Sequence, residues 1–391
     1  MSKLEELIQQ YCPDGVEWKT LGEVCDIHKG AQFNKTDMKE VGTYPVINGG
    51  INPSGYAEVF NEGKNTITVS QGGASAGYVN FLRNKFWLGA HCYAVTPYDT
   101  VLNKYLYHFI KMNEITLQQC QYGAGIPALA KSTISSLEIP VPPLPVQEEI
   151  VRILDNFTEL QAELQAELQK RLQQYEYYKW NIFEGLSCPT KHITDVALVK
   201  ARVGWQRLTT AEYQETGDYY LITGTDFKNG KIDFNSCVFV SKERYEMDPN
   251  IIVGKGDILI TKDGTLGKVA FMAEEPNKPT TLNSGVFRIH TTDLQVSSRY
   301  LFHYFTSKYF TDFVNSVKTG STIPHLTQQG LVSLNIPIPS LEEQNRVVSI
   351  LDRFDTLTTD LTQGLPAEIE KRRQQYEYYR DKLLTFKRKG A

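Results

Sequence analysis

The spacing of apolar residues changes along this chain, and each change marks the border of an expected element. Between residues 15 and 140, short apolar runs such as Thr66–Ser70 and Tyr78–Leu82 alternate with turns rich in Gly, Asn and Pro. This alternation predicts an irregular, mostly β globule. One helix is expected to interrupt it at residues 104–111, where KYLYHFIK places apolar residues at helical spacing.

Beyond residue 140, apolar residues recur at three- and four-residue steps, which is the spacing of one helical face. One such stripe runs from Ile150 to Tyr178 and another from Val347 to Leu383. Each follows a proline-rich segment, and because proline cannot continue a helix, these segments separate globule from helix. The first helix should span ~40 residues, or ~60 Å at 1.5 Å per residue. The second should kink or break near Gly364.

The second half of the sequence repeats the first. Residues 139–157 (IPVPPLPVQEEIVRILDNF) return as residues 336–354 (IPIPSLEEQNRVVSILDRF), and QQYEYY ends each repeat unchanged. An internal repeat decides the architecture. We therefore predict an α+β fold with two mostly-β globules in a pseudo-twofold arrangement, separated by two long antiparallel helices. The expected parts are a first globule with the N-terminal segment (1–140), a spacer helix (141–186), a second globule (187–335) and a C-terminal spacer helix (336–391).

The two spacer helices would bury their apolar stripes best against each other. The residues expected at this helix-pairing contact are Phe157, Leu160, Leu164, Leu168, Leu172, Phe354, Leu357, Leu361, Leu365 and Ile369. The tetrapeptide QAEL occurs twice in succession at residues 161–168. Its residues are good helix formers, and one such unit lengthens a helix by ~6 Å. In the QYEYY segments we interpret Tyr175 and Tyr178 as packing residues, and leave Tyr177 open between packing and partner docking.

Composition narrows the class of protein without deciding it. A chain of 391 residues should form more than one domain. With no apolar run of membrane-span length and no signal-peptide pattern at its start, we expect a cytoplasmic protein. The six cysteines lack CxxC spacing and indicate neither a disulfide frame nor a zinc site. The net charge of −4 means that any DNA contact must use local basic clusters or a positively charged partner.

The order of β globule, the motif IP-x-P-x-L-x-x-Q-x-x-[IV]-V-x-IL-D and a long helix, taken twice, resembles the specificity (S) subunit of type I restriction-modification systems. The QAEL tandem resembles the subgroup with four-residue repeats in its central helix. The resemblance covers nearly the whole chain. It implies two target-recognition domains, each reading half of a split, asymmetric site in double-stranded DNA, while the helices set the gap.

The same resemblance implies docking of two methyltransferase subunits, which use S-adenosylmethionine, and of restriction subunits, which use ATP and Mg. This chain itself should then hold no cofactor, no metal and no catalytic residue. The sequence agrees, because a P-loop requires GxxxxGK[ST] and the nearest string, GTDFKNGK at Gly224–Lys231, has one residue too many. The competing hypotheses are a self-contained nucleic-acid-modifying enzyme with an unrecognised site and a helical scaffold that binds only protein.

Base edges are read mainly by Arg, Lys, Asn and Gln, and phosphates are held by Lys, Arg, Ser and Thr. On this basis the candidate DNA-binding residues of the first globule are Lys29, Gln32, Asn34, Lys35, Asn48, Ser70, Gln71, Ser75, Lys85 and His91. Those of the second are Lys200, Arg202, Trp205, Gln206, Arg207, Thr223, Thr225, Lys228, Lys262, Asp263, Thr265, Lys268, Asn283, Ser284 and Arg288. The segment 200–207 (KARVGWQR) is the best candidate, because it concentrates cations around an aromatic residue. At any one position the alternative is a solvated loop residue.

Overall fold

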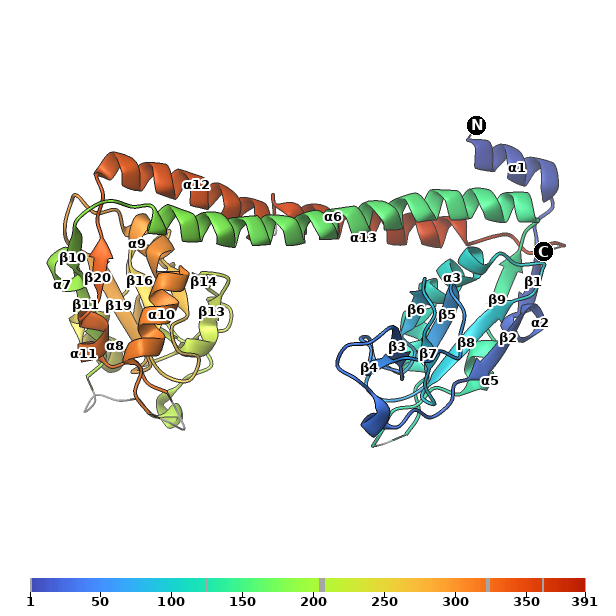
Figure 1. The fold of residues 1–391 in the computed structure, drawn as a ribbon, viewed down its shortest axis with the longest axis horizontal. Helices are drawn as coiled ribbons and strands as arrows, with labels where there is room; N and C mark the ends of the chain where they lie inside the picture. Colours follow the sequence, from blue (N-terminus) through green and yellow to red (C-terminus); the bar gives the residue numbers. More distant parts are fainter. Residues whose placement is uncertain (1, 124, 204–207, 321–323, 361, 391) are drawn as a thin grey trace. The chain divides into compact units, whose positions relative to one another are not determined.

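The computed structural model describes residues 2–123, 125–203, 208–320, 324–360 and 362–390 (Figure 1). The chain forms two compact units, residues 1–165 with 369–391, and residues 166–368. The border between them falls inside helix α6 (Leu144–Glu184). Each unit therefore contains one globule and a portion of the long helices.

The first unit is built on small sheets. The largest is antiparallel with strand order β2-β8-β5-β6, and a second has the order β4-β3-β7 with β3 parallel to β7. Strand β1 pairs with β9. The strands are β1 Glu17–Thr20, β2 Cys25–Lys29, β3 Tyr44–Ile47, β4 Gly55–Ala57, β5 Thr66–Ser70, β6 Val79–Leu82, β7 Trp87–Leu88, β8 Cys92–Pro97 and β9 Glu138–Val141. The helices are α1 Lys3–Tyr11, α2 Leu21–Val24, η1 Lys35–Asp37, α3 Asn103–Met112, α4 Glu114–Gln119 and α5 Lys131–Ser135.

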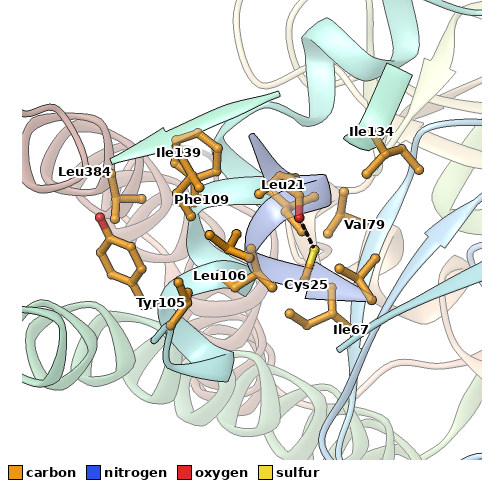
Figure 2. Close-up of a cluster of buried hydrophobic side chains, with 14 of the residues drawn as sticks. Leu21, Cys25, Ile67, Val79, Tyr105, Leu106, Phe109, Ile134, Ile139 and Leu384 are labelled. Atoms are coloured by element: carbon orange, nitrogen blue, oxygen red, sulfur yellow. Dashed lines mark hydrogen bonds between the residues drawn. The ribbon is translucent and has the colours of Figure 1, made fainter. Parts of the chain in front are cut away.

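The core of the first unit lies between the large sheet and its helices. All residues of β5 are buried, and the β-branched residues of TITVS suit a strand that is covered on both faces. Leu21 of α2, Ile67 of β5 and Leu106 of α3 belong to the same cluster, which also includes Leu384 from the far end of the chain (Figure 2). The thiol of Cys25 donates a hydrogen bond to the Leu21 carbonyl over 2.9 Å, and burial raises its pKa to about 12. It is a protonated core residue.

The second unit repeats this topology with different residues. Its sheets have the orders β11-β19-β16-β17, β15-β12-β18 and β10-β20, and β12 is parallel to β18 as β3 is to β7. The strands are β10 Thr190–His192, β11 Ala197–Ala201, β12 Tyr220–Ile222, β13 Phe227–Lys228, β14 Lys231–Ile232, β15 Val238–Phe239, β16 Ile258–Thr261, β17 Val269–Phe271, β18 Thr280–Leu282, β19 Val286–Thr291 and β20 Asn335–Pro337. The helices are α7 Ile193–Val196, η3 Thr210–Glu212, η4 Gly224–Asp226, α8 Lys242–Glu246, η5 Pro249–Ile251, α9 Ser298–Phe305, α10 Lys308–Val317 and α11 Gln328–Val332.

Strand order and strand direction thus agree between the two globules, and the hairpin β13–β14 is an addition in the second. The predicted α+β fold with two repeated, sheet-based globules is confirmed. The helix expected at residues 104–111 is α3, and α9 occupies the matching position of the second repeat.

The long helices follow the predicted lengths. Helix α6 has 41 residues. The second spacer is divided into α12 (Leu341–Thr359) and α13 (Leu365–Leu383), so the predicted break near Gly364 is confirmed. A Cβ atom at Gly364 would lie 2.4 Å from the Thr356 carbonyl oxygen, so only glycine fits against the end of α12.

Within each unit, α6 packs against a partner helix that runs antiparallel to it. In the first unit the Phe157 ring stacks on Tyr379 of α13, with centroids 5.3 Å apart. In the second, the Tyr175 ring stacks on Phe354 of α12 at 5.6 Å. The other predicted pairing residues are less central, being partly buried (Leu160, Leu164, Leu168, Leu172, Leu365, Ile369), exposed (Leu357, 37%) or outside the described residues (Leu361). Among the helices described here, none has the combined length and hydrophobicity needed to cross a membrane.

Candidate nucleic-acid interface

In the first unit, loops from four strands meet at one end of the sheets. The Gly30 amide after β2 donates to the Cys92 carbonyl at the start of β8 over 3.1 Å. The His91 amide donates to Asn48 Oδ1 over 3.2 Å, and the Gln71 amide donates to the His91 carbonyl over 2.8 Å. These bonds bring together the predicted residues Lys29, Asn48, Gln71 and His91. We call this end of the globule the first recognition face.

Another loop, residues 121–130, borders the first recognition face and was not among the predicted DNA-binding segments. The Leu129 amide donates to the Gln71 carbonyl over 2.7 Å, which fixes the loop beside the β5–β6 turn. Two large side chains of this loop project into solvent, Tyr122 at 57% and Ile126 at 76% exposure. The sequence did carry a signal, because GAGIPAL at 123–129 returns as GSTIPHL at 320–326.

The second unit forms an equivalent end from equivalent loops. The Asn283 amide donates to the Ile222 carbonyl over 2.9 Å, and the Lys262 amide donates to the Gly285 carbonyl over 2.9 Å. The Leu326 amide donates to the Lys262 carbonyl over 3.0 Å, as the Leu129 amide does to Gln71. The predicted residues Thr223, Lys262, Asp263, Asn283 and Ser284 therefore lie on a second recognition face.

Several side chains of the second recognition face are held by neighbours. His325 Nδ1 lies 2.6 Å from Asp263 Oδ1, and the Asn283 side-chain amide donates to the Tyr213 hydroxyl. The ammonium group of Lys262 lies 5.3 Å from the centroid of the Phe287 ring. His325 and Tyr213 were not predicted. The GSTIPHL repeat pointed to His325, whereas no sequence pattern singled out Tyr213.

The remaining candidates of the first globule differ in position. Gln32 and Asn34 are exposed on the loop that follows β2, and Lys35 is exposed at the start of η1. Ser70 is only 3% exposed, and Ser75 is half-buried in the β5–β6 turn. Lys85 follows β6 at the other end of the β5–β6 pair, where its ammonium group lies 4.1 Å from the centroid of the Phe60 ring. Lys85 therefore does not join the first recognition face.

Two predicted arginines of the second globule are structural. Arg202 is 2% exposed and donates to the Leu282 carbonyl over 2.9 Å and to Thr281 Oγ1 over 3.1 Å. Burial lowers the pKa of its guanidinium group. Arg288 Nε donates over 2.7 Å to Asp257, whose side chain is fully buried. The Arg202 guanidinium group is buried, and that of Arg288, whose side chain is 17% exposed, is bonded to the buried Asp257, so we leave both out of the recognition face.

Other candidates of the second globule lie around the face or beyond it. Thr225, Thr265 and Lys268 are exposed, and Lys200 is partly buried on β11. Lys228, in the added hairpin, forms an ion pair with Asp233 at 2.5 Å. Trp205, Gln206 and Arg207 lie outside the described residues, so the segment considered the best candidate is described only as far as residue 203.

One group of side chains has the composition of a metal site. The ligand atoms of His303, Asp352 and Asp355 lie within 4.8 Å of one another. However, Arg299 donates to Asp352 over 2.8 Å and to Asp355 over 3.4 Å, so a guanidinium group already balances these carboxylates. The arrangement fits an ion-pair network better than a cation site.

The geometry defines a class of protein. Two globules share one scaffold, and each gathers polar side chains at the same end of its sheets, Lys, Asn, Gln and His in the first and Thr, Lys, Asp, Asn and Ser in the second. This is the arrangement of a protein that reads nucleic acid at two places with different residues.

Comparison with known proteins gives the family. Residues 13–174 and 190–371 match the type I restriction modification DNA specificity domain. The chain is 34% identical over 389 residues to a putative type I restriction enzyme specificity subunit of Haemophilus influenzae, covering 95% of this chain and 96% of that protein. It is 28% identical over 403 residues to the EcoR124I/EcoR124II specificity subunit of Escherichia coli, covering 99% and 97%. Its fold is similar to the S subunit of M. genitalium, with a TM-score of 0.59 at 20% identity, covering 95% and 96% of the two chains.

The chain therefore belongs to the family of type I restriction-modification DNA specificity subunits. It recognises DNA sequence and is a non-catalytic component of such a system. Membership of this family implies DNA and other subunits of a type I restriction-modification system as its partner classes.

Proposed function

We propose that each globule reads one half of a split, asymmetric site in double-stranded DNA through its recognition face, and that the long helices set the gap between the halves. One observation carries this proposal: the scaffolds agree while the recognition faces differ. Asn48 and Thr223 follow equivalent strands, and Gln71 and Lys262 make equivalent backbone bonds to the neighbouring loop. Different side chains at equivalent places imply different base preferences.

Within each face we assign two kinds of contact. Asn48, Gln71 and Asn283 carry amide groups that suit base edges. Lys29, Lys35, Lys262 and Lys268 suit phosphates, and each supplies one charge to a chain whose net charge is −4. Because these four lysines add little positive charge to an acidic chain, we expect the partner subunits to supply most of the phosphate contacts.

We further propose that two methyltransferase subunits dock on the helices and that restriction subunits join them in the cytoplasm. The helices carry two copies of QQYEYY, and the central tyrosine of each is largely exposed, Tyr177 at 64% and Tyr378 at 61%. Tyr178 is 41% exposed although its ring lies 5.6 Å from Phe354. Two equal surfaces suit two copies of one partner. S-adenosylmethionine, ATP and Mg would bind those partners, and this chain would hold no cofactor.

The test is a domain exchange in the complete complex. Residues 187–335 are replaced by the equivalent globule of a relative, and methylated adenines are mapped in the DNA of cells that express each version. We expect one half of the motif to change and the other half to stay. A change in both halves, or a motif that is not split, would contradict the proposal.

A further inference from the structure

Each globule is joined to the spacer helix that follows it by the same polar contacts, in which the tyrosine, histidine and glutamine are buried and the aspartate is partly exposed. The residues are Tyr105, His108, Gln147 and Asp155 in the first unit and Tyr300, His303, Gln344 and Asp352 in the second. We call each set a joint. Tyr105 donates its hydroxyl proton to the Pro140 carbonyl over 2.9 Å, and Tyr300 donates to the Pro337 carbonyl over 2.7 Å. The same tyrosine–carbonyl hydrogen bond is therefore present in both joints.

The glutamine of the first joint connects the spacer helix to the start of α3. Gln147 is fully buried in α6, and its Oε1 accepts the amide proton of Leu102, the N-cap residue of α3, over 2.8 Å. Its Nε2 donates to the carbonyls of Thr100 over 3.0 Å and Pro142 over 2.7 Å. The amide of this one side chain therefore acts as both acceptor and donor, and it connects the globule, the linker and the helix.

The glutamine of the second joint does the same for α9. Gln344 is fully buried, and its Oε1 accepts the amide proton of Ser297, the N-cap residue of α9, over 2.8 Å. Its Nε2 donates to the carbonyls of Gln295 and Pro339, both over 2.9 Å. The bonds match those of Gln147 one for one.

On each spacer helix, one carboxylate is bonded to a histidine and to a cationic side chain of the globule. In the first joint, His108 Nε2 lies 3.3 Å from Asp155 Oδ1, and Lys104 Nζ lies 2.5 Å from Oδ2. His108 is 1% exposed, and burial lowers its pKa although the bond to Asp155 opposes this. The ring is therefore neutral and donates one N–H to the carboxylate. For Asp155, burial raises the pKa, but the bonds from His108 and Lys104 outweigh burial and the pKa is lowered.

The second joint replaces lysine by arginine and keeps the arrangement. His303 Nε2 lies 2.6 Å from Asp352 Oδ1, and Arg299 Nε donates to the same oxygen over 2.8 Å. His303 is fully buried. In both joints the cation stands four residues before the histidine, one turn earlier on the same helix.

The opposite helix completes each joint through the same tyrosine of QQYEYY. The Tyr376 hydroxyl lies 2.9 Å from His108 Nδ1 in the first unit. In the second unit, Tyr175 donates to Asp355 Oδ1 over 2.7 Å, next to the His303–Asp352 pair. In the first unit the opposite helix therefore bonds directly to the globule, whereas in the second it bonds to Asp355 of α12, a carboxylate to which Arg299 of the globule also donates over 3.4 Å.

Polar contacts of this kind restrict an angle more narrowly than apolar packing, which allows a small set of angles. Hydrogen bonds are directional, and polar networks select one arrangement when their members are paired. In the second joint His303 Nε2 is paired with Asp352, while its Nδ1 is buried without a hydrogen-bond partner among the described residues. Between the two repeats the recognition faces have changed their side chains, while the joints keep Tyr, His, Gln and Asp.

We propose that the joints fix the tilt of each globule on its helix and thereby determine the number of base pairs that the chain accepts between half-sites. This inference rests on the proposed two-part readout. A globule of ~130 residues has a radius of gyration of ~14 Å, so its far loops lie roughly 28 Å from the joint. A tilt of ~7° moves such loops by ~3.4 Å, which is the rise of one base pair. The joint residues are thus positioning residues that need not touch DNA.

The test uses Asp155→Asn and Asp352→Asn, each in the complete complex with its methyltransferase subunits. Methylated adenines are mapped over a library of sites whose gap varies by one base pair at a time. We expect unchanged half-site bases, but a preference for the wild-type gap that falls by about tenfold, the effect of one hydrogen bond to a charged group. The matched controls are Glu159→Gln and Glu342→Gln, which remove exposed carboxylates from the same helices and should leave bases and gap unchanged.

The outcomes separate the two proposals. If the wild-type complex methylates a motif that is not split, the proposed two-part readout of DNA is wrong. A split motif with wild-type gap preference in both aspartate variants would overturn the role of the joints. Should either aspartate variant fail to fold, Lys104→Gln decides, because Lys104 is 38% exposed at the rim of the joint. We expect Lys104→Gln to widen the range of gap lengths that the complex methylates. Lys104→Arg, which copies the cation of the second joint, should keep the wild-type range. A wild-type range with Lys104→Gln overturns the proposal.

Discussion

At the scale of single residues, burial separates the polar candidates that are held inside a globule from those that remain on loops. Arg202 and Lys262 were both candidates because cations suit phosphates. Arg202 lies inside the second globule with its bonds directed to β18, whereas Lys262 lies on a loop at the recognition face. Residue type shows that both side chains are cations. Their exposure shows whether that cation can reach a phosphate or is bonded within the globule.

Substitutions on the recognition faces should weaken DNA binding in ways that depend on the contact. Gln71→Ala should cost about 1–3 kcal/mol of binding free energy and relax discrimination at one position of the first half-site. Lys262→Ala should weaken binding to all sequences and reduce the salt dependence by about one unit of slope. Fluorescence anisotropy of the complex with labelled DNA measures both effects. The control is Lys85→Ala, at the other end of its globule, and an equal loss with Lys85→Ala would contradict the assignment of the face.

A histidine of the first unit should make stability depend on pH. His28 Nε2 lies 2.6 Å from Glu62 Oε1 and Nδ1 lies 3.1 Å from Asp26 Oδ2. The bond to Glu62 raises the pKa of His28, burial opposes this, and the bond to Asp26 adds to it. Because the folded-state pKa is raised, the stabilisation is complete below the unfolded value of about 6.5 and is lost as the pH rises through the folded value.

The measurement compares the unfolding free energy of the wild type and of His28→Gln across this range. His28 is 43% exposed, so solvent screening limits the difference to about 1 kcal/mol or less. We expect it to be largest at about pH 6 and smallest at about pH 9. A difference that grows with pH would show that the imidazolium is not the stabilising form.

At the scale of elements, the long helices obey the sequence pattern more closely than the strands do. The apolar stripe and the proline-rich segments predicted the long helices, and Gly364 predicted the break before α13. The strands are short, and β3, β7, β12 and β18 join into sheets through pairings between distant segments. A helix depends on neighbours within four residues, whereas a strand is completed by a partner that the local sequence does not contain.

Shortening α6 by one QAEL unit should shorten the accepted gap. Deleting Gln165–Leu168 removes ~6 Å of helix, which corresponds to between one and two base pairs, and four residues turn a helix by only ~400°, so the apolar stripe keeps nearly the same face. Methylation mapping should show the same half-site bases with a shorter gap. Gln165→Ala keeps the length of the helix and should keep the gap. An unchanged gap in the deletion variant would show that α6 does not set the distance.

At the scale of the whole molecule, the chain is two diverged copies of one plan. The strand orders agree, the joints agree, and the side chains on the recognition faces differ. The attachment of each globule to its helix is alike in the two copies. The side chains that face solvent at the recognition faces differ between the copies.

The isolated chain should bind none of the small molecules used by a type I complex. We expect no S-adenosylmethionine or ATP binding by isothermal titration of the purified subunit, and binding after the methyltransferase and restriction subunits are added. The added subunits serve as the positive control. Micromolar affinity in the isolated chain, about −8 kcal/mol, would support a self-contained enzyme instead.

The sequence by itself determined the repeat, the fold class, the long helices and the family resemblance, because each depends on residue spacing that is visible along the chain. Only the tertiary structure decided which candidates gather on a face. In the first globule the loops after β3 and β5 both bond to the loop before β8, and in the second the end of β12 and the loop after β16 both bond to the segment between β18 and β19, which is far away in sequence. It also decided that Arg202 is internal, that Arg288 is bonded to the buried Asp257 and that His108 and His303 belong to joints. Burial and hydrogen-bond partners are properties of the packed chain, and a list of residues does not contain them.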